Sequence, residues 1–213
     1  REKTLGRMAR QIAQTIEGWD VQEYLDHLVA EVQHHEKIQV LTETLVVGFG
    51  GYKGNFTTEV LVGPGPYERK IEHGVTIVAT GALEYRPREF LYGDHPRVMT
   101  QLELGRQLRN NPLEIGRWEN LVMIQCVGSR NEEHPNCSRV CCQSAVKHAL
   151  HLADLNPDMQ ITILYRDVRT YGLLEEYYKS ARGKGILFVR FDADRPPRVT
   201  GDGEGLCVTF RDH

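Results

Sequence analysis

Residues 121–142 read LVMIQCVGSRNEEHPNCSRVCC, and this stretch decides how we expect the second half of the chain to fold. It opens with a continuous apolar run at 121–124, which predicts a buried strand, and it leads into a helix expected over about 138–154. The same alternation continues with a strand at 161–165, a helix at about 174–182 and a strand at 186–190. Continuous apolar strands separated by helices predict an α/β fold with a parallel sheet, right-handed crossovers and helices on both faces.

Four of the five cysteines lie in this stretch, at Cys126, Cys137, Cys141 and Cys142, and the fifth is Cys207. So few thiols, grouped so closely, favour a bound metal or cluster over a disulfide framework. The first cysteine follows the expected strand and the other three begin the expected helix, at the edge of a parallel sheet where ligands bind. The unpaired N–H groups and the positive end of a helix stabilise thiolates and anionic clusters. The sequence therefore predicts a cluster where a dinucleotide-binding fold holds a diphosphate.

Cys141 and Cys142 are adjacent, and neighbours on a regular helix point about 100° apart. A [4Fe–4S] cube offers four separated iron corners, whereas one zinc ion needs four sulfurs on a small tetrahedron. We therefore expect a [4Fe–4S] cluster held by the four grouped cysteines. Two alternatives stay open: a zinc-stabilised protein-interaction module without redox chemistry, and a metal-free, degenerate nucleotide-binding scaffold.

Polar residues near the cysteines have more than one interpretation. Four of them are candidates to donate hydrogen bonds to cluster sulfurs, namely Ser129, Arg130, Ser138 and Arg139. An equally good interpretation makes Ser138 an N-cap and places both arginines in a solvated loop. His134 and His148 are possible metal ligands, but the four cysteines already complete a ligand set, and we expect His148 on the polar face of its helix.

Asp167 and Arg169 follow the strand expected at 161–165, where nucleotide-binding folds place groups that contact ribose or phosphate. The dinucleotide glycine fingerprint is missing upstream, so we interpret both residues as ordinary surface charge.

Composition describes a globular chain of 213 residues with 40% hydrophobic residues, 26% charged residues and a formal net charge of -3. The basic residues are dispersed, which argues against a nucleic-acid partner. No apolar stretch approaches the roughly 20 residues that span a bilayer, and no signal peptide is visible. Isolated thiols fit a reducing compartment. We therefore expect a cytoplasmic protein with no membrane span.

The first half of the chain has a different pattern. Helical spacing over 8–36, broken near Gly18, predicts two helices. Alternating residues at 38–49 and 55–62, joined by a glycine-rich turn, predict an antiparallel β-hairpin. The remaining expected elements are a strand at 67–72, a buried strand at 75–81, an irregular linker at 86–97, and a helix from 101 to about 108 capped by Thr100. We place a domain boundary after residue 99, which gives the units 1–99 and 100–213.

Several segments resemble the A-subunit family of heterodisulfide reductases. The resemblance is carried by residues 54–56, 79–81, 92–104, 125–130, 137–142 and 165–172, so it extends over nearly the whole chain. It implies a thioredoxin-reductase-like FAD/NAD(P)-binding fold and a flavin- and iron–sulfur-dependent oxidoreductase of anaerobic metabolism. Its partners would be other subunits of a redox complex and electron-carrier proteins. It also implies that Cys126, Cys137, Cys141 and Cys142 ligate a [4Fe–4S] cluster close to the flavin.

The resemblance implies FAD contacts in the first half of the chain. Glu2 matches the residue that hydrogen-bonds the adenosine ribose, and Gly6 belongs to the same motif, in which Arg7 replaces a second glycine. Thr80 and Gly81 match a strand end that approaches FAD. The cofactors carry the chemistry of such a protein, so we assign no catalytic side chain.

The two ends of the chain predict a piece of a longer polypeptide. The first residue is Arg1, and the strand-like run at 206–210 has no partner after it. The family's first strand and its phosphate-binding glycine loop are expected upstream of Arg1. Unit 1–99 is then a partial FAD-binding domain, and unit 100–213 a Rossmann-like domain that carries the cysteines. We expect this fragment to bind FAD weakly or not at all, and to be inactive alone.

Overall fold

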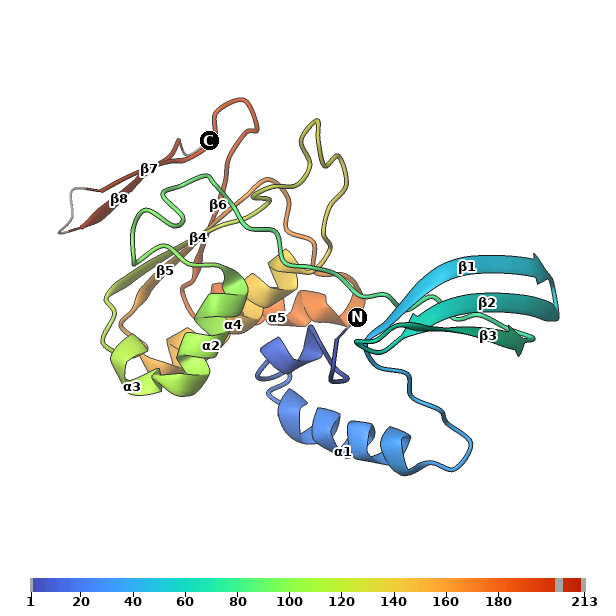
Figure 1. Ribbon diagram of the computed structural model, residues 1–213. Helices are drawn as coiled ribbons and strands as arrows, with labels where there is room; N and C mark the ends of the chain where they lie inside the picture. Colours follow the sequence, from blue (N-terminus) through green and yellow to red (C-terminus); the bar gives the residue numbers. More distant parts are fainter. Residues whose placement is uncertain (1, 202–204, 212–213) are drawn as a thin grey trace. The chain divides into compact units, whose positions relative to one another are not determined.

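The computed structural model describes residues 2–201 and 205–211, and the chain divides into two units (Figure 1). The first unit comprises Arg1–Ile12 and Asp20–Leu83, and the second comprises Ala13–Trp19 and Glu84–His213. This boundary differs from the one we placed after residue 99. The reason is that the guanidinium of Arg86 and the hydroxyl of Tyr92 both donate hydrogen bonds to the carboxylate of Glu103, which ties the segment after Leu83 to the second unit.

The second unit is built on a parallel sheet, as predicted. Its strands are β4 (Asn120–Ile124), β5 (Gln160–Tyr165) and β6 (Leu187–Arg190), in the order β4-β5-β6. Both pairings are parallel, with Met123 opposite Ile163 and Ile163 opposite Phe188. Parallel neighbours place their carboxyl ends at one edge, so the segments after β4 and β5 emerge side by side there.

The helices of this unit are η2 (Gly172–Leu174), α2 (Gln101–Asn110), α3 (Pro112–Ile115), α4 (Cys141–Leu155) and α5 (Glu175–Gly183). The four α-helices share one hydrophobic core with the sheet. Its members with the least exposed surface are Ile115, Ala145, Val146, Ala149, Leu152, Ile161, Ile163 and Ala181. Four of them, Ala145, Val146, Ala149 and Leu152, form the face of α4 that holds the helix, and therefore its first turn, against the sheet.

The start of α2 was predicted correctly from local sequence. The hydroxyl of Thr100 accepts a hydrogen bond from the Glu103 amide, and the Glu103 carboxylate accepts one from the Thr100 amide. This reciprocal pair is a capping box. In contrast, α4 begins at Cys141 and not at residue 138, and its N-cap residue Val140 has no capping side chain.

The first unit contains an antiparallel sheet of β1 (Thr44–Tyr52), β2 (Asn55–Val62) and β3 (Tyr67–His73), which confirms the predicted hairpin and third strand. Of the two helices expected over 8–36, the second is present as α1 (Val21–His34), capped by the Asp20 carboxylate. The first prediction was wrong: the chain forms only the 3-10 turn η1 (Ala9–Gln11). Spacing alone does not supply the capped, continuous turn that a helix needs to start.

The strand predicted at 75–81 is also wrong. The described residues of this segment have no regular secondary structure, and Val75 and Ile77 are 76% and 86% exposed. A strand requires a neighbour to pair its backbone N–H and C=O groups. Apolar composition predicts the preference for burial but does not provide that partner.

One further two-stranded sheet joins β7 (Arg198–Gly201) to β8 (Leu206–Thr209). The expected strand at 206–210 is therefore present, and its partner precedes it in the chain. Among the described residues, no helix is long and apolar enough to cross a membrane.

Candidate metal centre

The grouped cysteines lie at the carboxyl edge of the parallel sheet. Cys126 comes two residues after the end of β4, and Cys141 and Cys142 occupy the first turn of α4. Cys137 lies in the connecting loop and not in the helix. Cys142 is buried, the other three are partly buried, and Cys207 is exposed on β8; all five thiols are free. Cys126, Cys141 and Cys142 thus lie where the sequence predicted them. Cys137 was expected at the start of the helix and lies instead in the loop before it.

The loop between β4 and α4 is held in an unusual backbone conformation. Cys126, Arg130 and Arg139 have positive φ angles of 64°, 60° and 64°, a region that costs a residue with a Cβ roughly 1–2 kcal/mol. Gly128 adopts φ 65°, and a Cβ there would lie 2.1 Å from Cε1 of Tyr85. Only glycine allows this close approach. The loop is therefore shaped by its tertiary contacts and not by local preference.

Three of the thiols interact with one another. A hydrogen bond from Cys142 lowers the pKa of Cys141 to about 6, and hydrogen bonds from the Ser138 hydroxyl and from the amides of Cys126 and Cys142 act in the same direction. The bond to Cys141 raises the pKa of Cys142, as does burial. Burial, followed by the charge of Cys141, raises the pKa of Cys126. Of these three thiols, Cys141 ionises first.

Cys137 has different neighbours within the described part of the chain. Its sulfur accepts a hydrogen bond from the Arg139 amide at 3.3 Å. Its charge raises the pKa of Arg169, whose guanidinium is 3.6 Å from the carboxylate of Asp167. The Cys142 thiol donates a hydrogen bond to the main-chain oxygen of Asp167, with a sulfur–oxygen distance of 3.6 Å. Cys137 is connected to the other thiols through this shared arginine–aspartate group.

A metal ion and a cluster make different demands on these donors. Within residues 2–201 and 205–211, no three His, Cys, Asp or Glu side chains are placed to hold one metal ion. A four-thiol donor set on a loop and a helix start is suited in chemistry to an iron–sulfur cluster, whose ligands bind separate irons.

A second observation supports the same fit. Gln125, between β4 and Cys126, is only 3% exposed, and its Nε2 has no hydrogen-bond partner among the described atoms. This side chain lines a narrow, mainly apolar space together with Cys142, which is too small for a water molecule. A buried N–H donor without an acceptor costs about 1–3 kcal/mol. A sulfide or thiolate acceptor within hydrogen-bond distance would satisfy this donor, which is compatible in chemistry with a cluster held by the adjacent Cys126.

Of the four polar residues predicted to donate hydrogen bonds near the cysteines, two contact a thiol through their side chains in the described structure. Nη1 of Arg130 is directed at the Cys126 sulfur at 4.0 Å, and Ser138 donates to Cys141, as proposed from the sequence. Ser138 is not an N-cap, because Val140 has that position. No side-chain contact to a thiol is present for Ser129 or Arg139 in the described structure, where Arg139 contributes its main-chain amide.

Asp167 and Arg169 are not ordinary surface charges. Asp167 is 2.7 Å from Nη2 of Arg130 and 3.6 Å from Nη2 of Arg169. These residues follow β5, the neighbour of β4 in the parallel sheet, so they reach the loop that carries Cys126. The available signal was their position after a parallel strand, which we set aside because no glycine fingerprint preceded them.

The two histidines have structural neighbours. His148 is 5% exposed, so its expected place on the polar face of the helix was wrong; its Nδ1 lies 2.7 Å from Oε1 of Gln101. His134 is exposed, and its ring makes an edge contact with Tyr85, with centroids 6.1 Å apart. Neither ring contacts a cysteine in the described structure.

The residues assigned to FAD by resemblance lie in the first unit. Glu2 is exposed and pairs with Arg7 at 3.5 Å, and its carbonyl accepts from the Glu43 amide. A Cβ on Gly6 would be 2.8 Å from Leu25. Thr80 and Gly81 are in the exposed segment without regular structure. No described contact joins Glu2 or Gly6 to Thr80 or Gly81, and their assignment to FAD stays a prediction.

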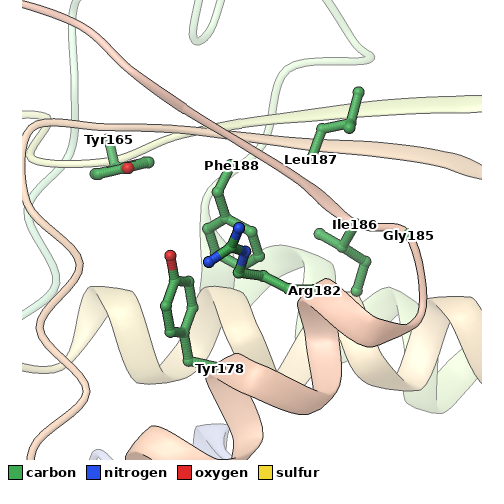
Figure 2. A pocket seen from close by; sticks show the side chains of 7 residues that line it. All are labelled: Tyr165, Tyr178, Arg182, Gly185, Ile186, Leu187 and Phe188. Carbon is green, nitrogen blue, oxygen red and sulfur yellow. The ribbon is translucent and has the colours of Figure 1, made fainter.

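An open cavity of about 370 Å³ in the second unit was not expected from any sequence pattern. Figure 2 shows the side chains that line it: Tyr165, Tyr178, Arg182, Gly185, Ile186, Leu187 and Phe188. The rings of Tyr178 and Phe188 meet edge to face at 4.7 Å, and the Arg182 guanidinium is 5.9 Å from the Tyr178 ring centre. The aromatic pair and the cation form part of its walls.

Comparisons with known proteins place the chain among named relatives, although no family model matches it. One relative is the A subunit of the H(2):CoB-CoM heterodisulfide,ferredoxin reductase from Methanothermobacter marburgensis. It is 40% identical over 162 residues, which cover 68% of this chain and 24% of the relative. The A subunit of the Ferredoxin:CoB-CoM heterodisulfide reductase from Methanosarcina mazei is 37% identical over 140 residues, or 59% of this chain and 18% of the relative.

A third relative, the first iron-sulfur A subunit of the CoB--CoM heterodisulfide reductase from Methanopyrus kandleri, is 34% identical over 165 residues, covering 68% of this chain and 24% of its own length. The chain thus spans about a quarter of the length of these curated relatives, or less. Among solved structures, the crystal structure of HlmI aligns over 96% of this chain and 57% of that chain, with 14% identity and a TM-score of 0.37, which is too low to indicate a shared fold. The sequence comparisons confirm the predicted family: the matched part of the chain belongs to the heterodisulfide reductase A subunits.

Proposed function

We propose that this chain is part of an oxidoreductase subunit that transfers electrons through a [4Fe–4S] cluster held by Cys126, Cys137, Cys141 and Cys142. The observation that carries the proposal is the meeting of the β4 end and the first turn of α4, where Cys126, Cys141 and Cys142 perturb one another's ionisation. The names of the relatives support it, since all are subunits of reductases and one is described as an iron-sulfur subunit.

The protein's own contribution is to prepare thiolates and donors. Because its pKa is lowered to about 6, Cys141 is largely a thiolate at neutral pH, the form that binds iron. The first turn of α4 lacks a capping side chain, so its amides are available to sulfur. Arg130, Ser138 and Gln125 add donors around the thiols. When bound, the cluster supplies one-electron transfer, which requires no acid–base or nucleophilic side chain.

The wider protein is part of the same proposal. We infer that the intact polypeptide binds FAD as well, in a thioredoxin-reductase-like fold with Glu2, Gly6, Thr80 and Gly81 near the flavin. Other subunits of a redox complex would donate or accept the electrons. The resemblance supports the flavin and the fold, and the names of the relatives, of whose length the chain spans about a quarter, support the presence of other subunits.

The test is anaerobic reconstitution of the 213-residue chain with iron and sulfide. We expect about four irons and four sulfides per chain, and a paramagnetic signal after reduction. Serine substitution of each of the four grouped cysteines should lower the iron and sulfide content, whereas Cys207→Ser, on the exposed strand β8, should leave it unchanged. Zinc in place of iron, or equal loss in Cys207→Ser, would contradict the proposal.

A further inference from the structure

An arginine and an aspartate from different elements meet beside Cys126. Nη2 of Arg130, from the loop after β4, is 2.7 Å from Oδ2 of Asp167, from the segment after β5. Nη1 of the same guanidinium is directed at the Cys126 sulfur at 4.0 Å. The Arg130 side chain is 19% exposed and that of Asp167 is 45% exposed, so the charge nearest the thiol is also the better shielded of the two.

Both ends of this pair are anchored independently of it. The main-chain oxygen of Arg130 accepts a hydrogen bond from Nη1 of Arg166 at 2.9 Å. Asp167 presents its main-chain oxygen to the Cys142 sulfur at 3.6 Å while its carboxylate holds Arg130. A planar guanidinium has donors in a fixed fork, so one nitrogen can be held by a carboxylate while another faces a second acceptor.

We infer that Asp167 is a positioning residue that directs the Arg130 guanidinium at Cys126, and that this arrangement raises the reduction potential of the cluster. The inference rests on the proposed function. Uptake of one electron, supplied in a titration by dithionite, adds one negative charge beside the Cys126 sulfur. A fixed cation and a directed N–H donor stabilise that added charge, and Arg130 keeps its charge at every accessible pH. Arg130 itself forms and breaks no bond.

The direct test compares Arg130→Met with Arg139→Met in reconstituted protein, by a redox titration followed by electron paramagnetic resonance. Arg139 is an exposed arginine of the same loop with the same positive φ, and its amide rather than its side chain contacts a thiol, so it is the matched control. We expect Arg130→Met to lower the ratio of reduced to oxidised cluster at a fixed potential about tenfold, which is about 59 mV for a one-electron couple. Arg139→Met should change it much less. Equal shifts in both variants would overturn the inference.

The role of Asp167 is tested by measuring Asp167→Asn in two backgrounds. Loss of the Asp167 charge by itself raises the potential in both backgrounds; if Asp167 acts through Arg130, the same change in the otherwise unchanged chain also releases the guanidinium, so the rise there should be smaller or reversed. In the Arg130→Met background the same change removes only a negative charge, and the potential should rise. A rise of the same size in both backgrounds would show that Asp167 does not position Arg130.

Two further measurements keep the inference testable if Arg130→Met binds no cluster. Arg130→Lys keeps the charge without the fork, and its potential should lie below those of the unchanged chain and of Arg139→Met. In protein labelled with arginine that carries ¹⁵N only in the guanidinium group, electron–nuclear double resonance of the reduced sample should show a nitrogen coupling that Arg130→Lys removes; its persistence would count against the inference. Absence of iron from the unchanged chain would instead refute the proposed function, so the two failures are distinguishable.

Discussion

His148, in the buried part of α4, lies with its Nδ1 at 2.7 Å from Oε1 of Gln101 in α2. The other ring nitrogen faces Gly105, where an added Cβ would be 3.2 Å away. The close approach of these two helices therefore depends on a ring held in one orientation by a single side-chain partner. His148 lies in the same helix as Cys141 and Cys142, so the packing of its ring helps to hold the helix that carries these two cysteines.

This buried ring predicts acid sensitivity. Burial, followed by the charges of Lys147 and His151, lowers the pKa of His148 to about 3, whereas an unfolded histidine has a pKa of about 6.5. Between these values the unfolded chain binds a proton that the folded chain does not. The free energy of unfolding should therefore fall as the pH drops from about 6.5 towards 3, by up to about 1.4 kcal/mol per unit, and should not depend on the ionisation of this residue above about pH 6.5. Urea denaturation of the unchanged chain and of His148→Gln should show a shallower slope in the variant; equal slopes would contradict the prediction.

Gln125→Met should have opposite effects on the metal-free chain and on cluster retention. The substitution removes the buried Nε2 donor that has no partner among the described atoms, at nearly equal volume. We expect the metal-free chain to gain about 1 kcal/mol in unfolding free energy, and the reconstituted chain to lose iron faster to a chelator. Destabilisation of the metal-free chain, combined with unchanged iron release, would mean that this amide serves only the apolar core.

Gly128→Ala should disturb the cysteine loop through contact with Tyr85. Its added Cβ would lie 2.1 Å from the ring, so the ring or the loop must move. Gly172→Ala is a matched control, because Gly172 has a similar φ of 60° with nothing within 4 Å of an added Cβ. Both variants bear the cost of a positive φ, but only the first should reduce iron content after reconstitution. The measurement is iron per chain, and similar values for the two would rule out a steric role for Tyr85.

Thr100→Ala should destabilise the second unit by about 1 kcal/mol, since it removes the side-chain half of the capping box at α2. Thr100→Ser keeps the hydroxyl and should retain most of that stability. Denaturant unfolding of the three chains gives the comparison. A serine variant as unstable as the alanine variant would show that the methyl group, and not the hydrogen bond to the Glu103 amide, matters here.

Elements with a complete local signal were predictable. The cap at Thr100, the hairpin of β1 and β2 and the parallel strands β4 and β5 all follow from capping residues, turn glycines and apolar runs. The segment at 75–81 carries an equally strong apolar signal but has no neighbouring strand, and it forms none. The helix predicted around Ala9–Gln11 is absent for a related reason. The apolar spacing there is helical, but no side chain caps the segment and it forms only one short turn.

The sequence by itself determined the chemical content of the candidate centre: four thiols in Cys126–Cys142, spaced to join a strand end to a helix start. Only the tertiary structure decided that Asp167 meets Arg130, that His148 is buried against Gln101, and that Gln125 has a donor without a partner among the described atoms. Spacing encodes preferences between residues a few positions apart. Contacts between strand ends, or between α2 and α4, depend on which elements pack together, and that is set by burial over the whole unit.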